Sequence, residues 1–370
     1  MTLSRTTTFL IGAAAIVIVV TGLRSAAGIV GPVVLALALT IVFHPMRATL
    51  ERRMPVWAAS LVVLFAVYML IVLMTLALVV SIGQLAALVP TYAPQINDLV
   101  GQFGDWLAAR GIKSAQVDAV AGALDVGQLV DVATSLLSSV LSVLSDLFFL
   151  ITLLLFLAFD AAQVTPLLRN ARVHRPHMVD ALGSFARGTR SYLGVSAVFG
   201  LIVAVIDTVL LSVMGVPGAF VWGVLAFVTN FIPNIGFVIG IVPPAVVGLL
   251  EGGPGLMLAV IAMYCVVNLV IQSIIQPRYV GNAVGLSTSL TFLSLVFWTW
   301  VLGPLGALLA VPMSLLFKAV LVEADPAAAW MIPLISGHPE DEPAVEAAGT
   351  EQADTTEQAD TGMGQVPGHA

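Results

Sequence analysis

The most informative polar residue lies inside an apolar stretch. Asp207 sits near the middle of a run of hydrophobic residues, where an unpaired carboxylate in a bilayer costs about 3 kcal/mol. Removal from water favours the neutral acid over the carboxylate, so Asp207 suits the coupling of transport to a proton or a cation. Two alternatives stay open. Asp207 either pairs with a buried polar group or faces a water-filled cavity without coupling anything.

Side-chain amides form two further candidate groups. Asn230, Pro233, Asn234 and Gly236 interrupt one long apolar run. Amides both donate and accept hydrogen bonds, which suits a neutral polyol or a cation, although asparagines also cap the ends of broken helices. A second group recurs every four residues on one helix face, where it either lines a pathway or joins neighbouring helices: Asn268, Gln272 and Gln276.

The last long apolar run contains a similar interruption. It is formed by Gly303, Pro304 and Gly306. Proline inside a helix removes a hydrogen bond and clashes with the preceding turn, so this motif and the one at Pro233 both predict broken helices. Arg278 lies between the two motifs, either as a charge that sets orientation or as a contact for the substrate or a hairpin tip.

Other kinds of chemistry lack a signal in the sequence. The chain has no phosphate-binding loop of the P-loop type and no arrangement of serine, histidine and aspartate typical of hydrolases. Its one cysteine, Cys265, excludes a disulfide within the chain. We therefore expect no enzymatic activity, no catalytic residues, no cofactor, no metal site and no nucleic-acid partner.

The elements that must hold these residues are membrane helices. Of the 370 residues, 59% are hydrophobic and 9% are charged, compared with about 25% charged in soluble domains. Because about 20 apolar residues cross a bilayer as a helix, the chain is predicted to be an all-α, polytopic membrane protein with about eight hydrophobic segments. These segments are residues 9–23, 28–43, 56–80, 143–159, 192–214, 219–250, 255–276 and 287–322.

Two of these segments are too long for a simple crossing. Residues 219–250 and 287–322 would each measure about 50 Å as one helix, and each is broken near its middle. We expect re-entrant hairpins, each following one ordinary helix, which would make an inverted repeat in the C-terminal half. Such paired interruptions are typical of transporter substrate sites. The alternative is a pair of long, broken spanning helices.

The distribution of charge predicts the organisation. Residues 1–80 hold the first transmembrane helices, a scaffold, and residues 81–142 form an external amphipathic helical segment. Residues 143–322 form the transport unit with a basic loop at 162–190, whose arginines place it in the cytoplasm. Residues 323–370 carry ten acids and no lysine or arginine, which predicts a disordered acidic tail. Both termini are expected to be cytoplasmic.

The C-terminal half resembles a known family. The run from Gly215 through Trp222, Asn230 and Pro233 to Pro244 is similar to the autoinducer-2 exporter family, and so is the later run from Gln276 to Pro312. The resemblance implies export of a small quorum-sensing molecule across the bacterial inner membrane. It also implies homo-oligomers.

The predicted function is therefore secondary transport. The chain would export a small polar solute, autoinducer-2 or a related metabolite, with possible coupling to proton or cation movement. The expected partners are membrane lipid, a small-molecule or ion substrate, and further copies of the chain. The alternatives are a cation/proton antiporter or channel-like protein without organic cargo, and a membrane scaffold whose acidic tail recruits a partner.

Overall fold

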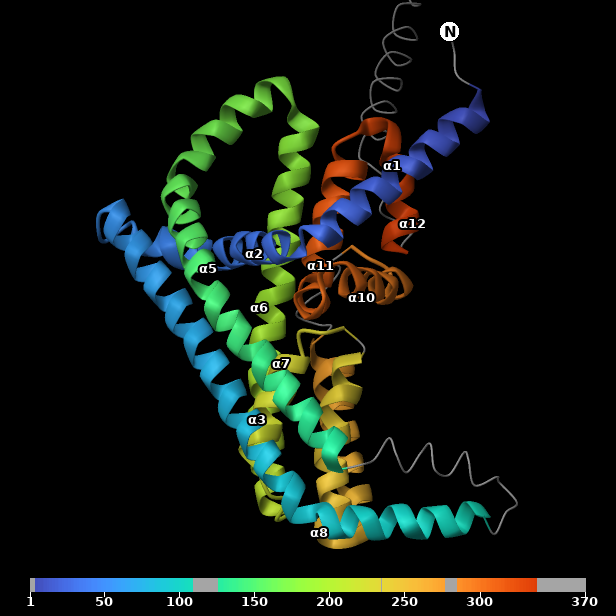
Figure 1. Cartoon of the computed structure of the whole chain (residues 1–370). Coiled ribbons are helices and arrows are strands. Elements are labelled where there is room, and N and C mark those ends of the chain that lie inside the picture. The colour runs from blue at the N-terminus through green and yellow to red at the C-terminus, as the bar shows by residue number, and fades with distance from the viewer. Residues whose placement is uncertain (1–3, 109–125, 234, 277–284, 338–370) are drawn as a thin grey trace, which may run out of the picture.

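The computed structural model describes residues 4–108, 126–233, 235–276 and 285–337, and every regular element in these ranges is helical (Figure 1). All eight predicted hydrophobic segments contain helix. Some of the described apolar helices are shorter than a full crossing, whereas five helices are long and apolar enough to cross a membrane. The five are Ala27–Leu50, Val56–Ala77, Pro176–Val213, Ile235–Gln272 and Pro304–Glu323. The chain is thus a polytopic helical membrane protein.

The described helices that precede α6 (Pro176–Val213) are α1 (Arg5–Ser25), α2 (Ala27–Leu50), α3 (Val56–Ala108) and α5 (Val126–His174). Three of them pack together, α2, α3 and α5, and α1 lies beside α2 and α10 (Thr288–Leu302). Helices α3 and α5 run side by side and pack with α2 around a core of aliphatic side chains (Figure 1). The described parts of the predicted amphipathic segment, residues 81–108 and 126–142, are continuations of α3 and α5.

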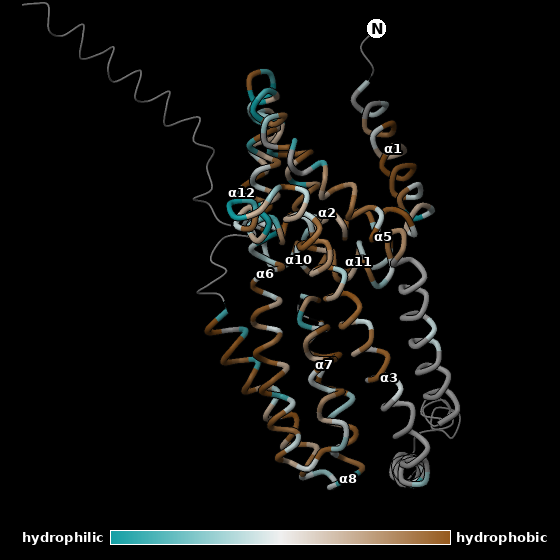
Figure 2. Tube along the Cα trace, turned by 90° about the vertical axis from the view of Figure 1, so that its left-hand side faces the viewer, coloured by the Kyte–Doolittle hydropathy of each residue, from teal (hydrophilic) through white to brown (hydrophobic). Residues whose placement is uncertain are grey.

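The residues of the predicted basic loop, 162–190, are helical rather than irregular, and their position in the cytoplasm stays a prediction. Helix α5 continues to His174, and α6 (Pro176–Val213) begins after a single residue. Pro176 stands in the first turn of α6, where a missing N–H costs nothing. The helical path is interrupted only at the non-helical Arg175, although Pro166 also lies inside α5. Figure 2 shows hydrophilic residues gathered where α5 meets α6.

The first long segment is two helices that pack against each other. Helix α7 (Ala219–Thr229) ends at the Asn230–Pro233 motif, and α8 (Ile235–Asn268) starts directly after it. The two come so close that a Cβ on Gly236 would lie 1.9 Å from the carbonyl oxygen of Thr229. Helix α8 reverses direction at Gly253, whose φ of 69° only glycine adopts readily (Figure 1).

The second long segment has the same construction. Helix α10 (Thr288–Leu302) and α11 (Pro304–Lys318) meet at Gly303 and pack closely. A Cβ on Gly306 would lie 1.9 Å from the carbonyl oxygen of Trp298. Trp298 is only 3% exposed, and its Nε1 donates to the Ser314 hydroxyl over 3.0 Å, so this tryptophan packs between the two helices rather than facing lipid.

The tail begins later than predicted. A 3-10 helix, η3 (Pro326–Met331), and a short helix, α12 (Ile332–Ser336), continue the fold past residue 323. Ser336 is buried, and the Ser287 N–H donates to the Ile335 carbonyl over 2.8 Å. Trp330 and Leu334 remain exposed, so the segment is held by its helical turns and by the contact of Ile335 and Ser336 with the body of the protein. The rest of the tail, residues 338–370, lies outside the described residues.

Candidate functional site

An open polar cavity lies between α6, the α7–α8 turn, the start of α10 and η1, the π-helix Leu269–Ile275 that extends α8. We call it the wide cavity. Its volume is about 290 Å³, close to the lower limit of ligand pockets. Among the described residues, no acidic or basic side chain lines it. The polar lining residues are Tyr192, Ser196, Thr229, Asn230, Gln272, Gln276, Thr288 and Thr291.

A smaller polar cavity adjoins the wide cavity on the side of Asp207. We call it the narrow cavity. Its volume is about 10 Å³, room for about one water molecule. The two cavities adjoin, because four residues line both of them: Thr229, Asn230, Phe237 and Gln272.

A chain of hydrogen bonds separates the two cavities. Asn230 donates through Nδ2 to the Ser196 carbonyl over 2.8 Å, and Gln272 donates through Nε2 to Asn230 Oδ1 over 2.9 Å. This amide bridge joins α6, the α7–α8 turn and η1. Gly200 provides the space, since a Cβ there would lie 2.9 Å from Asn230 Nδ2.

Asp207 is completely buried in the narrow cavity. Its side chain is 0% exposed, and neither carboxylate oxygen has a hydrogen-bond partner among the described residues. The Tyr264 hydroxyl, on a side chain that is 1% exposed, is also without a described partner. Unsatisfied buried polar groups are uncommon, and two of them on one small cavity make it a candidate site.

The structure brings five of the eleven predicted pathway residues together at the two cavities: Asn230, Pro233, Asn268, Gln272 and Gln276. Asn268 and Gln272 line the narrow cavity, and Gln272 and Gln276 line the wide cavity. The predicted α-helical spacing is wrong for part of this stripe, because Leu269–Ile275 is a π-helix. π-helical turns occur frequently at functional sites.

The second Pro/Gly motif lies elsewhere. Gly303, Pro304 and Gly306 line neither polar cavity, and the second hairpin contributes Thr288 and Thr291 to the wide cavity instead. Asn234 and Arg278 lie outside the described residues, so their predicted roles stay predictions.

Several lining residues gave no usable signal in the sequence. Tyr192, Ser196, Thr229 and Tyr264 are hydroxyl side chains within apolar helices, where such residues also serve ordinary packing. Tyr192 additionally donates to the Phe231 carbonyl over 3.0 Å, which ties α6 to the α7–α8 turn. Only the three-dimensional convergence of four helical segments reveals this group.

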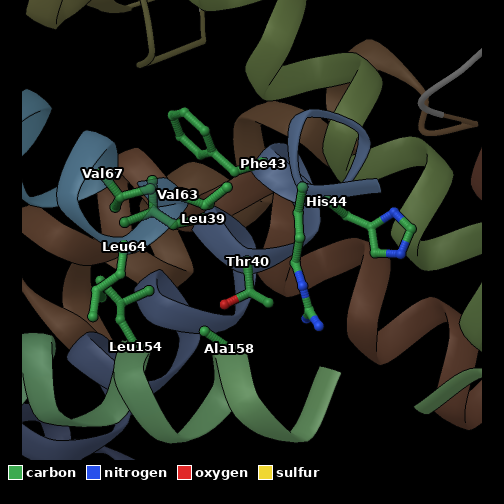
Figure 3. Close-up of a pocket in the computed structure, with 10 residues that line it drawn as sticks. Leu39, Thr40, Phe43, His44, Val63, Leu64, Val67, Leu154 and Ala158 are labelled. Atoms are coloured by element: carbon green, nitrogen blue, oxygen red, sulfur yellow. The ribbon is translucent and has the colours of Figure 1, made fainter. Parts of the chain in front are cut away.

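A separate pocket of about 30 Å³ lies between the scaffold helices (Figure 3). Figure 3 shows Leu39 of α2, Val63, Leu64 and Val67 of α3 and Leu154 of α5 gathered on one side. Its lining is mainly aliphatic and shares no residue with the wide or narrow cavity. The pocket lies apart from the two polar cavities, and the rest of its lining includes Thr40, His44 and Arg47.

Comparison with known proteins places this architecture in a family. The family model described as "AI-2E family transporter" matches residues 9–324. The AI-2 transport protein TqsA of Escherichia coli K12 is 33% identical over 310 residues, which cover 83% of this chain and 89% of TqsA. The protein YhhT of the same organism is 30% identical over 307 residues, which cover 82% of this chain and 87% of YhhT. With both broken helices and both polar cavities inside the matched range, the chain belongs to the AI-2E family of membrane transporters.

Proposed function

We propose that this chain exports a small, uncharged polar solute, AI-2 or a related metabolite, by secondary transport. The observation that carries the proposal is the wide cavity, which is lined by hydroxyl and amide groups without a charged side chain among the described residues. Such a lining can hydrogen-bond a polyol through both donors and acceptors. The name of TqsA, an AI-2 transport protein, supports the same class of cargo.

Alternating access would arise from the two hairpins. Each consists of two closely packed helices whose approach depends on a glycine against a backbone carbonyl, Gly236 on Thr229 and Gly306 on Trp298. Rigid units of this kind move as bodies rather than deforming. We propose that α6 with the α7–α8 hairpin, and the end of α8 with the α10–α11 hairpin, form an inverted repeat that rocks against the N-terminal scaffold.

Asp207 would couple this movement to an ion. Its burial beside the path and its unpartnered oxygens support titration or cation binding during the cycle. The small volume of the narrow cavity also favours a second candidate function, a cation/proton antiporter or channel-like protein without organic cargo, because that cavity has room for only one small species.

The wider setting follows from the same proposal. We place the chain in the bacterial inner membrane with both termini in the cytoplasm, on the basis of its arginine-rich segments. The exposed apolar faces of α1 and α3 would contact lipid or other copies of the chain in a homo-oligomer.

The hairpin arrangement predicts a specific labelling pattern. In a chain whose Cys265 is replaced by alanine, single cysteines at Ala219 and Leu250 should react with an impermeant maleimide from the same side of the membrane. The reason is that a re-entrant hairpin returns to its side of entry. Labelling from opposite sides would show a spanning segment and would remove the inverted repeat from the proposal.

The cavity predicts protection by cargo. Thr291→Cys, in the same cysteine-free background, should react with a small methanethiosulfonate reagent, because Thr291 lines the wide cavity and is partly exposed. Saturating AI-2 should slow this reaction at least about fivefold if it occupies the cavity, by simple competition. A cysteine at His177, which is exposed in the hydrophilic region where α5 meets α6, provides the control whose rate stays constant. Equal rates at Thr291→Cys with and without solute would contradict the proposal.

A further inference from the structure

We infer that the narrow cavity is a binding site for one dehydrated monovalent cation, held by the Asp207 carboxylate together with the oxygens of Tyr264, Asn268 and Gln272. The inference deepens the coupling role proposed for Asp207 and rests on it, since it names the ion class and the ligands. The cavity is polar, buried and contributed by separate helical segments, α6, the end of α7, α8 and η1.

The hydrogen bonds already present leave oxygen atoms for an ion. Asn268 donates through Nδ2 to the Tyr264 carbonyl over 2.9 Å, and Gln272 donates through Nε2 to Asn230 Oδ1 over 2.9 Å. These bonds engage the nitrogen ends of both amides, so the amide oxygens are the ends that remain as acceptors. Hard cations select oxygen ligands of this kind.

The charge of the site selects a monovalent ion. Asp207 and Tyr264 are the only titratable side chains in its lining; α6, the α7–α8 turn and η1 otherwise contribute neutral groups among the described residues. One carboxylate neutralises one positive charge, whereas a divalent ion would leave a net buried charge at high cost. A proton and the cation therefore compete for the same carboxylate.

The size of the site selects a small ion. A volume of about 10 Å³ accommodates one water-sized species but no hydrated ion. Sodium or lithium without water fits this limit, and choline does not. The amide bridge of Asn230 and Gln272 lies between this site and the wide cavity, so an ion that binds Gln272 would act on the wall of the solute site.

The test is thermal stabilisation of the purified full-length protein in detergent. Sodium chloride, compared with choline chloride at equal ionic strength, should raise the Tm by about 4 °C at saturation, because the ion binds only the folded state. Lowering the pH should raise the sodium concentration needed for half of this shift. Asp207→Asn should abolish the shift, and Tyr264→Phe should raise the half-maximal concentration about tenfold.

Ser60→Ala is the matched control. Ser60 in α3 also carries a buried hydroxyl, since the residue is 2% exposed, but it does not line the narrow cavity. This variant should keep the full sodium shift. A wild-type protein without a sodium-specific shift, or an unchanged shift in Asp207→Asn, would overturn the cation site. Proton-driven solute efflux in sodium-free buffer would then still support the proposed function. A sodium shift without any solute transport would support the site and remove the function.

Discussion

Solute efflux by an Asp207→Asn variant is expected to lose its dependence on an imposed ion gradient. Asparagine keeps the size of the side chain but neither titrates nor carries the charge that would attract a cation. Because Asp207 is the only carboxylate that lines either polar cavity among the described residues, no neighbouring group can replace it. The rate of gradient-driven efflux from proteoliposomes should fall about tenfold or more. This corresponds to an increase of about 1.4 kcal/mol or more in the activation free energy of transport.

The fold should survive this change. Both Asp207 oxygens are buried without a described partner, so the neutral amide removes a charge that folding otherwise leaves uncompensated. The Tm of Asp207→Asn in choline chloride should equal or exceed that of the wild type. Ser60→Ala, measured in parallel, should transport with unchanged gradient dependence. Undiminished, gradient-dependent efflux by a well-folded Asp207→Asn variant would exclude Asp207 from coupling.

Gly306→Ala is expected to lower the stability of the protein strongly. A Cβ at position 306 would lie 1.9 Å from the Trp298 carbonyl oxygen and 2.5 Å from its carbonyl carbon. Both are backbone atoms of α10, so no side-chain rotation relieves the clash. Helix α11 would have to move away from α10, which also stretches the Trp298–Ser314 hydrogen bond.

The expected cost is about 3 kcal/mol or more in the free energy of unfolding, typical of severe overpacking. Size-exclusion chromatography after heating should show loss of the monodisperse peak at a Tm several degrees below that of the wild type. Gly22→Ala in α1 is the control, since a Cβ there meets nothing within 4 Å and alanine favours helix. A Tm equal to that of the control would mean that the two helices do not pack as closely as described.

The features that could be predicted correctly from the sequence are those that depend on neighbouring residues in the chain. Proline and glycine at Pro233 and Gly303–Pro304 break helices through their own backbone geometry, so both interruptions could be located from the chain alone. The burial of Asp207 follows similarly from a single carboxylate within an apolar run. Gly236 lies directly after the first interruption, and a Cβ there would meet the end of α7.

The features that escaped prediction depend on partners distant in sequence. Tyr264 and Ser196 line the polar cavities only because α8 and α6 converge in the fold. The hydrogen bond between Gln272 and Asn230 likewise joins residues 42 positions apart in the sequence. Trp298 is buried because α11 packs against it, and an aromatic residue within an apolar run does not reveal that contact. The lengths of α3 and α5, 53 and 49 residues, exceed any membrane crossing, so hydropathy could not set their ends.

Transport by the purified wild-type protein tests the central claim most directly. Proteoliposomes loaded with AI-2 and given a proton gradient should release the solute faster than protein-free liposomes, and faster than the same proteoliposomes without a gradient. Prior reaction of Thr291→Cys with the methanethiosulfonate reagent should stop this release, because the label fills the wide cavity. Release that equals the protein-free rate, or that continues after complete labelling, would contradict secondary transport through this cavity.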